Sequence, residues 1–464
     1  MKVVCIATAR PTFAVDAAAE RAKQARALLT ETGAEVTGPD ELVMTPEDIE
    51  AAASHLDGQP DLVVNVCATF SDATPGLRLY RELDTPVLLW AFREPGEVGD
   101  RLWLNSLCGA NLFGHALVRE GGAVRLLYGD PDEPEVRTAL RRALAGELPA
   151  APPLPTTHRT RADEAEARQA LDRLTGKRIG VIGDAPPGFT PSEYDPDLIA
   201  DLFGVSTEPL TVPEMFAKVA DVDADTRTAE LADALAQRPT LDGLAPDHLD
   251  RFAAVTSALR DWTAERTLPA VAVRCWPEFP TELGVCPCSA LSRVADEGTV
   301  SACERDVYGA LTMLLLEALG SGPTYLVDTV DLDAARNLVR VWHCGSAATA
   351  LAADPANATQ SVHCNRKIGV TGDFGLKTGP VVLARLTDNP GGGLRLLLAS
   401  GESVPAPNRF QGNTADVVLD ARADEFVHGL VTGGFPHHTV LAWRDVRPAL
   451  RATADLLGIP VIEW

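Results

Sequence analysis

Carboxylate and imidazole side chains gather at three places in this sequence. Glu278 follows an apolar run within the string RCWPEF, and Asp306 stands two residues after Glu304 in CERD. His437 and His438 are adjacent in GGFPHHTV, beside a glycine turn. Carboxylate oxygens combined with an imidazole suit Mn²⁺, Mg²⁺ or Co²⁺. These residue types therefore predict a site for a divalent cation.

Each of these residues also has an ordinary structural interpretation. A carboxylate at the end of a strand or helix is most often solvated, and Glu304 or Asp306 could simply favour the dipole of the helix that follows. Adjacent histidines in a glycine turn are usually surface residues. Four cysteines of this region have the spacing C-x10-C-x-C-x14-C, unlike the C-x2-C pairs of structural zinc sites. We therefore favour buried, reduced thiols over zinc at Cys275, Cys286, Cys288 and Cys303.

A cation site at Glu278 needs a strand that ends just before it. The run Leu268–Arg274 is typical of a buried strand, and α/β sheets carry their ligands at the carboxyl ends of parallel strands. The first 150 residues hold further apolar runs, separated by helical patterns such as Val15–Glu31. These runs are Lys2–Thr8, Asp61–Val66, Thr85–Phe92 and Ala123–Tyr128. They indicate a parallel sheet that is covered on both faces.

Changes in composition divide the rest of the chain. The Pro- and Thr-rich residues 148–160 are typical of a linker, and KRIGVIG at 177–183 begins a second α/β unit. From about Thr324, short β-type runs between Gly and Asn-Pro turns indicate an antiparallel barrel or sandwich. The last residues predict a helix and a strand that returns to an earlier sheet. We expect two Rossmann-like or flavodoxin-like α/β domains (1–150 and 177–325), a linker and connecting helix (151–176), and a β-rich, antiparallel barrel-like C-terminal domain (326–464).

The composition excludes several classes of protein. The 464 residues carry 41 Lys and Arg against 65 Asp and Glu, a net charge of −24. This balance argues against binding to nucleic acid or to an anionic membrane surface, and no run approaches the roughly 20 apolar residues that span a bilayer. Nine cysteines without a secretion signal predict a cytoplasmic location. The sequence has no Walker A loop, no G-x-G-x-x-G turn and no G-x-S-x-G elbow.

Several separated motifs occur in the order of a known family. They are RCWPEF at Arg274–Phe279, CSALS from Cys288, CERD from Cys303, GALTM from Gly309, LVRVWHCGSA at Leu338–Ala347 and PHHTV at Pro436–Val440. Together they resemble the L-fucose isomerase-like family. The resemblance is strongest over residues 270–345 and 431–440, and L-arabinose isomerases are more distant relatives.

The resemblance implies a metal-dependent aldose–ketose isomerase that binds one divalent cation, usually Mn²⁺. Glu278 matches the Glu of the WPE motif, Asp306 matches the Asp of CE-x-D, and His438 or its neighbour His437 matches the late His. The cation would bind the oxygens at C1 and C2 of an open-chain sugar. Of Glu278 and Asp306, one would remove the proton from C2 to give a cis-enediolate, and the other would help to return it at C1. His343 lies in the motif where the arabinose enzymes place a further histidine.

Further residues are expected near the sugar. Arg274 and Trp276 flank the proposed ligand and are candidates to line the pocket. Family members are homo-oligomers, hexamers or trimers, in which the N-terminal domain covers a neighbour's pocket, so Arg93 is a candidate to contact substrate across an interface. Arg274 and Arg305 are compatible with an anionic substituent. L-fucose, other 6-deoxy sugars, pentoses and sulfonated or otherwise acidic sugars all stay open as substrates.

Two other functions stay open on the sequence alone. A metal-dependent hydrolase or lyase that acts on a sugar derivative would use the same ligands to activate water. A non-catalytic sugar-binding protein would hold its ligand between two α/β domains. Metal dependence separates an enzyme from a binder, and the identity of the product separates an isomerase from a hydrolase.

Overall fold

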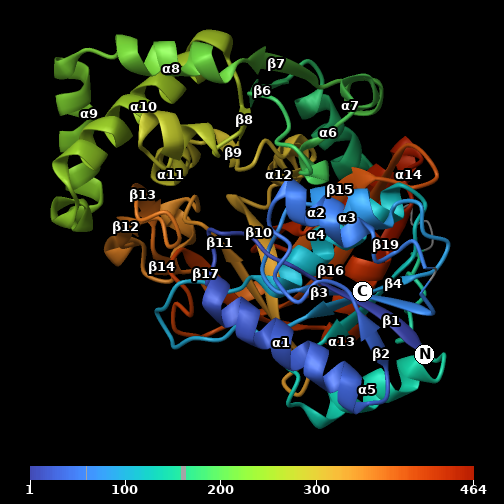
Figure 1. Ribbon diagram of the computed structural model, residues 1–464. Helices are drawn as coiled ribbons and strands as arrows, with labels where there is room; N and C mark the ends of the chain where they lie inside the picture. The colour runs from blue at the N-terminus through green and yellow to red at the C-terminus, as the bar shows by residue number, and fades with distance from the viewer. Residues whose placement is uncertain (59, 158–162) are drawn as a thin grey trace.

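Three sheets organise the protein, and their strands follow one another along the chain (Figure 1). The computed structural model describes residues 1–58, 60–157 and 163–464. Two parallel sheets with helices on both faces are followed by a large, mostly antiparallel mixed sheet, which confirms the predicted fold class. The predicted linker at 148–160 falls partly on residues 158–162, which lie outside the described residues. The domain boundaries stay a prediction.

The first sheet is parallel and has the strand order β2-β1-β3-β4-β5, as in flavodoxin-like folds. Its strands are β1 (Lys2–Thr8), β2 (Glu35–Thr37), β3 (Leu62–Cys67), β4 (Val87–Ala91) and β5 (Val124–Tyr128). One core forms under α1 (Val15–Glu31) and α5 (Pro134–Leu144), and the other under α2 (Pro46–Ala53), α3 (Thr74–Tyr80) and α4 (Ser106–Arg119). Every residue of β3 and β4 is buried, because helices cover both faces.

The second sheet is also parallel, in the order β7-β6-β8-β9. It consists of β6 (Arg178–Ile182), β7 (Ser206–Leu210), β8 (Ala270–Val273) and β9 (Val300–Ala302). On one face lie α6 (Glu164–Leu174), α7 (Pro196–Phe203) and α12 (Val307–Ala318), and on the other α8 (Val212–Asp221), α10 (Pro246–Arg266) and α11 (Cys288–Asp296). Helix α9 (Ala224–Gln237) packs on α10 at the edge of the unit. Short helical turns are η1 (Thr190–Ser192), η2 (Pro239–Gly243) and η3 (Phe279–Leu283).

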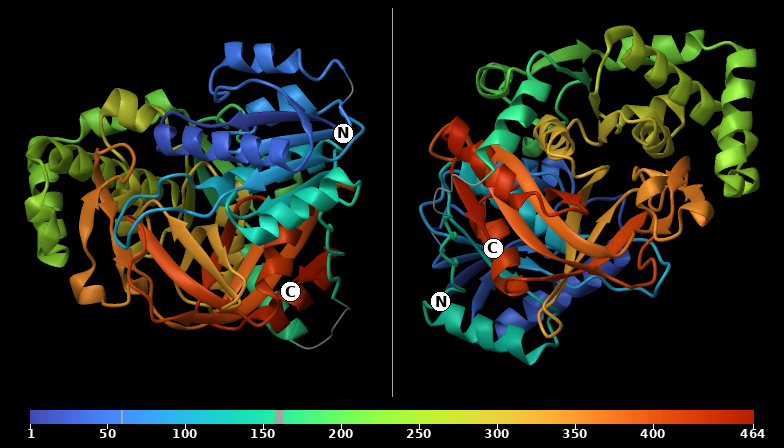
Figure 2. Two further views of the ribbon diagram at one scale, coloured as in Figure 1. Left: turned by 60° about the horizontal axis from the view of Figure 1, so that its bottom comes forward. Right: turned by 180° about the vertical axis from the view of Figure 1, so that it is seen from behind.

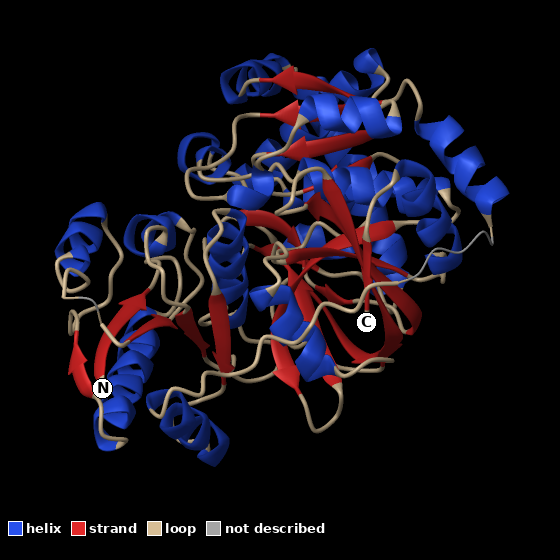
Figure 3. Cartoon of the chain, turned by 90° about the vertical axis from the view of Figure 1, so that its right-hand side faces the viewer, coloured by secondary structure: helices blue, strands red, loops and turns tan. Residues whose placement is uncertain are grey.

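The third sheet closes into a barrel, because β16 pairs with β17 in addition to its neighbour β15. The closed ring contains β10 (Thr324–Asp333), β11 (Leu338–His343), β15 (Gly379–Asp388), β16 (Leu394–Val404), β17 (Asn413–Leu419) and β18 (His438–Ala442), all antiparallel. Gly401 permits the closure, since a Cβ there would stand 2.2 Å from the Val418 carbonyl oxygen. Figures 2 and 3 show the curved strands of this barrel between the helices.

The remaining C-terminal elements flank the barrel. They are β12 (Gln360–Val362), β13 (Gly369–Gly372), β14 (Phe374–Gly375), η4 (Thr349–Leu351), η5 (Pro355–Asn357), α13 (Ala423–Thr432), α14 (Arg447–Leu457) and β19 (Val461–Glu463). Strand β19 runs parallel to β16, so the predicted returning strand joins the barrel sheet. Strands β12 and β13 form a separate hairpin against α11. Among the described residues, no helix combines the length and apolar character that crossing a membrane requires.

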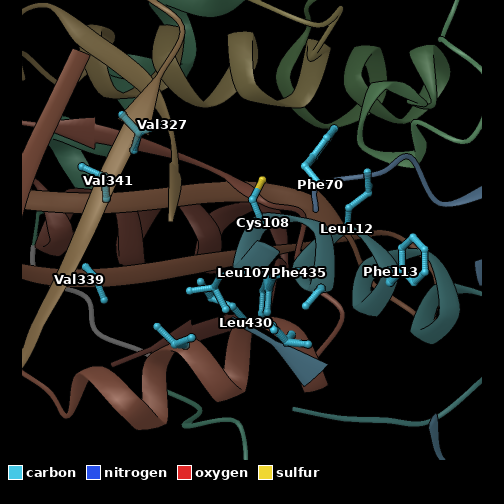
Figure 4. Close-up of a cluster of buried hydrophobic side chains, with 14 of the residues drawn as sticks. Phe70, Leu107, Cys108, Leu112, Phe113, Val327, Val339, Val341, Leu430 and Phe435 are labelled. Carbon is cyan, nitrogen blue, oxygen red and sulfur yellow. The ribbon is translucent and has the colours of Figure 1, made fainter. Parts of the chain in front are cut away.

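Helix α4 joins the first α/β unit to the barrel. Twelve of its residues are buried, and one apolar cluster combines its side chains with those of β10, β11 and α13 (Figure 4). The Asn111 side-chain amide donates to the Pro436 carbonyl oxygen at 3.2 Å, directly before the two histidines. At Gly114, a Cβ would stand 2.4 Å from the Val431 carbonyl oxygen of α13. The close approach of α4 and α13 therefore depends on a glycine.

Gly114→Ala is expected to lower the free energy of unfolding by about 1–3 kcal/mol, because the added methyl group forces the two helices apart. Gly243→Ala is the matched control, since a Cβ there would meet nothing within 4 Å. Chemical denaturation of both variants measures the difference. Equal midpoints for the two variants would contradict this account of the α4–α13 contact.

Candidate active site

A pocket opens where the two α/β units meet the barrel. The loop after β9 supplies Glu304, the strand β10 supplies Asp328, and β18 begins at His438. Asp328 and His438 are direct cross-strand partners in the antiparallel pair of β10 and β18. The register of two neighbouring strands therefore brings a carboxylate and an imidazole together, and the carboxyl edge of the second sheet adds another carboxylate.

Two buried carboxylates that line this pocket, Glu304 and Asp328, lie close to the imidazole of His438. The Nε2 atom of His438 lies 3.2 Å from Glu304 Oε2 and 3.4 Å from Asp328 Oδ1. None of these three atoms has a hydrogen-bond partner among the described residues. Buried polar atoms are normally paired, because an unpaired one costs free energy. Glu304, His343 and His438 offer ligand atoms that all lie within 4.8 Å of one another, a donor set that fits a divalent cation, and Asp328 adjoins this set at His438 Nε2.

Glu304 is held in place by a strained turn and by an indole. Trp276 donates from Nε1 to Glu304 Oε1 at 3.2 Å, which leaves Oε2 free to face His438. Glu304 and Arg305 both have a φ of +59°, a left-handed conformation that is unfavourable for residues other than glycine. Arg305 stabilises the turn by donating to two carbonyl oxygens, those of Gly183 at 2.6 Å and Ser192 at 2.8 Å.

His438 is oriented from behind by Asp306. Its Nδ1 lies 2.9 Å from Asp306 Oδ2, which directs Nε2 toward Glu304 and Asp328. Asp306 in turn accepts a hydrogen bond from Arg385 at 2.8 Å and caps α12 by accepting from the Gly309 backbone N–H at 2.8 Å. Because its oxygens are occupied in this way, Asp306 positions the imidazole. A carboxylate behind a histidine is the usual support of a metal-binding imidazole.

The charges of the cluster shift its protonation strongly. Burial alone would lower the pKa of His438, but the hydrogen bond to Asp306 and the nearby carboxylates of Glu304 and Asp328 outweigh it and raise that pKa to about 10. Burial raises the pKa of Asp328 to about 7, with His438 opposing the shift and the charge of Glu304 adding to it. Without a cation, the cluster therefore keeps protons near neutral pH that a bound cation would displace.

Three histidines line this pocket, and two of them, His437 and His343, lie next to the cluster as neutral imidazoles. Burial lowers the pKa of His437 to about 4 and that of His343 to about 3. His437 packs edge-on against Phe189, with ring centroids 5.3 Å apart. Glu304, His343 and His438 each offer a ligand atom within 4.8 Å of the others. His343 is therefore near enough to take part in the same site.

Comparison with known proteins agrees with the resemblance found in the sequence. Residues 4–141 match the family model for the fucose/sulfoquinovose isomerase N-terminal domain. A sulfoquinovose isomerase of Alkalicoccus urumqiensis is 36% identical over 464 residues, covering 100% of this chain and 99% of that protein. The chain belongs to the fucose/sulfoquinovose isomerase family. It is an aldose–ketose isomerase, as predicted.

Other relatives carry the same name. A sulfoquinovose isomerase of Priestia aryabhattai is 30% identical over 459 residues, which are 98% of each chain. One from Clostridium sp. (strain MSTE9) is 31% identical over 454 residues, 97% of this chain and 96% of that protein. These full-length matches favour an isomerase over the hydrolase, lyase and sugar-binding alternatives.

The structure brings only part of the predicted isomerase site together. Asp306, His437, His438 and His343 cluster as expected, and Trp276 lines the pocket. Their placement leaves open which of them bind a cation. Two carboxylates that the sequence analysis did not select, Glu304 and Asp328, complete the cluster. Glu304 stands in the same CERD string as Asp306, and Asp328 is a lone charge in the apolar run TYLVDTV.

Glu278 and Arg274 lie elsewhere in this isomerase. Glu278 accepts from Arg274 at 2.8 Å and faces a second pocket that Arg305 also lines. Neither Glu278 nor Asp306 belongs to any group of three candidate ligands among the described residues, whereas Glu304 is grouped with His343 and His438, and Asp328 with Cys108 and His437. The physical reason is local: the indole of Trp276 reaches Glu304, whereas Glu278, two residues later, forms its ion pair on the side of Arg274.

Arg93 does not reach the pocket within this chain. It pairs with Glu133 at 2.5 Å and donates to the Leu332 carbonyl oxygen at 2.9 Å, which fixes it between the first unit and the barrel. The first unit instead supplies Arg10 and Phe70 to the pocket wall. The expected homo-oligomer with a shared pocket stays a prediction.

The cysteines that the sequence analysis singled out, Cys275, Cys286, Cys288 and Cys303, are buried as predicted, and the choice of reduced thiols over zinc stays a prediction. All nine cysteines are free, and burial or neighbouring thiols raise the pKa of Cys286 and Cys288 to about 12. Cys288 and Cys344 lie with their sulfurs 3.5 Å apart at the wall of the pocket.

Asp306→Asn is expected to lower the pKa of His438 from about 10 toward its ordinary value of 6.5, because the amide no longer favours the imidazolium. NMR titration of selectively labelled histidines in EDTA-treated protein measures this pKa. Asp331→Asn is the control, since Asp331 pairs with Arg340 away from His438. An unchanged His438 pKa in Asp306→Asn would show that Asp306 does not set the charge of the imidazole.

Proposed function

We propose that this isomerase converts a sulfonated aldose, sulfoquinovose, into the corresponding 2-ketose with the help of a divalent cation. The observation that carries the proposal is that Glu304 Oε2 and Asp328 Oδ1 both lie within 3.4 Å of His438 Nε2, all three atoms being buried and without hydrogen-bond partners among the described residues. The name shared by the relatives supports the sugar. Sulfoquinovose is a glucose whose C6 carries a sulfonate in place of the hydroxyl.

Glu304, Asp328 and His438 would hold the cation, with His343 close enough to be a fourth ligand. Two carboxylates and an imidazole suit Mn²⁺, and Co²⁺ or Mg²⁺ are the alternatives. When bound, such a cation polarises a carbonyl and stabilises negative charge that develops on oxygen. The Glu278 and Asp306 pair expected from the sequence is replaced in this proposal, because the geometry offers Glu304 and Asp328 instead.

Isomerisation moves a hydrogen from C2 of the open-chain aldose to C1 and a proton from O2 to O1. Glu304 and Asp328 are the only carboxylates of the described residues that line this pocket, so they are the groups available to carry these protons. Asp328 has its pKa raised to about 7 by burial, near the value at which a group can both accept and return a proton. Asp306 keeps His438 oriented and takes no proton from the sugar.

The pocket wall favours a sugar and restricts water. Trp276 and Trp342 line it together with Phe13 and Phe70, and aromatic faces of this kind pack against the apolar faces of sugar rings and chains. His437 supplies a neutral imidazole beside Glu304, with 3.5 Å between Nε2 and Oε2. It can donate to or accept from a sugar hydroxyl without adding charge.

Glu304→Gln is expected to lower kcat/KM by at least about 1,000-fold and to weaken Mn²⁺ binding, because it removes one ligand and one proton carrier at once. Glu278→Gln is the matched control and should keep activity within about threefold, since that carboxylate faces Arg274. The measurement is ketose formation from sulfoquinovose after EDTA treatment, with and without added Mn²⁺.

The two variants separate the assignment made from the structure from the one made from the sequence. Loss of turnover in Glu278→Gln with full activity in Glu304→Gln would reverse the assignment. Ketose formation that is unaffected by EDTA in the wild-type enzyme would show that the cation has no part in the reaction.

A further inference from the structure

The pocket is lined by groups of both charges. Glu304 and Asp328 are its carboxylates, and Arg10 and Arg366 line the same cavity. Arg10 comes from the loop after β1, and Arg366 from the turn between β12 and β13. Guanidinium groups in a concave site attract ligand groups of negative charge.

Neither guanidinium forms a hydrogen bond or ion pair within the part of the chain that the structure describes. Arg10 lies over the indole of Trp276, with 4.3 Å between the guanidinium carbon and the ring centroid. Stacking on an aromatic face leaves the N–H edges of an arginine available to another partner. By contrast, Arg274, Arg293 and Arg385 are paired with carboxylates at the neighbouring surfaces and in the core.

The backbone around both arginines is held firmly. The Arg10 backbone N–H donates to Thr69 Oγ1 at 2.8 Å. In the turn of Arg366, the ring nitrogen Nδ1 of His363 accepts from the Asn365 and Arg366 backbone N–H groups at 3.3 and 3.4 Å. Arg101 donates to Asn365 Oδ1 at 3.0 Å and ties this turn to the first α/β unit. Both cations are thus presented by fixed backbone segments.

We propose that Arg366 and Arg10 bind the sulfonate of the substrate, and that Arg366 selects sulfonated over neutral aldoses. This proposal rests on the function proposed above. With C1 and C2 at the carboxylates, the substituent at C6 is the part of an open-chain hexose furthest from the cation site. A sulfonate offers three oxygens with a full negative charge, and arginine binds such groups with paired N–H donors.

Neutral sugars would gain little from this arrangement. Their hydroxyl groups can accept a hydrogen bond from arginine, but they do not compensate the charge of two guanidinium groups that face one cavity. Burial lowers the pKa of Arg10, and the charge of Arg366 adds to this shift while the carboxylates of Asp72 and Glu304 oppose it, so Arg366 and Arg10 repel each other. An anion placed between them relieves this repulsion, so the sulfonated sugar gains binding energy that its neutral analogue lacks.

The test compares sulfoquinovose with quinovose, the 6-deoxy sugar that differs only by the sulfonate. In Arg366→Gln, the ratio of kcat/KM for sulfoquinovose over quinovose is expected to fall at least about tenfold, mainly through KM, because a charge-assisted hydrogen bond is lost. Arg366→Lys keeps the charge without the paired donors and should give an intermediate ratio. Arg336→Gln, an exposed position in the turn between β10 and β11, controls for the change in net charge.

The outcomes separate this proposal from the function on which it rests. If the wild-type enzyme isomerises neither sugar, the proposed function fails. If it isomerises sulfoquinovose and the ratio is unchanged in both Arg366 variants, the function stands and the assignment of Arg366 is overturned. A preference of the wild-type enzyme for glucose 6-phosphate over sulfoquinovose would likewise overturn the sulfonate assignment.

Discussion

The contact between Asp306 and His438 is the interaction on which the rest of the site depends. It is buried, and it fixes the direction of one imidazole at the junction of the second α/β unit and the barrel. Arg385 on β15 neutralises Asp306 from the other side, and α12 begins there with Asp306 as its cap. A buried carboxylate is tolerated only with such partners, so three elements must meet at this point for the chain to fold.

Around this contact, each of the three sheets positions a different part of the site. The register of β10 and β18 sets Asp328 beside His438, and the strained turn after β9 brings Glu304 to the same point. The first unit covers the pocket through α4 and the loop of Arg10, and its apolar cluster is continuous with the barrel. The strained turn and the unpaired polar atoms are unfavourable in free energy. Burial of the large apolar cores offsets them, as is common at functional sites.

The sequence predicted the fold well because its signals are local. The bounds of β1 and α1 agree with the predicted Lys2–Thr8 and Val15–Glu31, since an apolar run and a helical period need no distant partner. The sequence also predicted half of the cluster, because Asp306 and the histidine pair lie in recognisable motifs. Glu304 and Asp328 were not selected. Their place in the site depends on the pairing of β10 with β18 and on the direction of one turn, and spacing along the chain reveals neither.

The central claim is that Glu304, Asp328 and His438 form one cation site. The most direct measurement is anomalous diffraction at the manganese edge from crystals of the enzyme grown with Mn²⁺. The account predicts one strong peak within coordinating distance of Glu304 Oε2, Asp328 Oδ1 and His438 Nε2, with Asp306 behind the imidazole. A peak beside Glu278, or the absence of a peak at a concentration of Mn²⁺ that supports turnover, would contradict it.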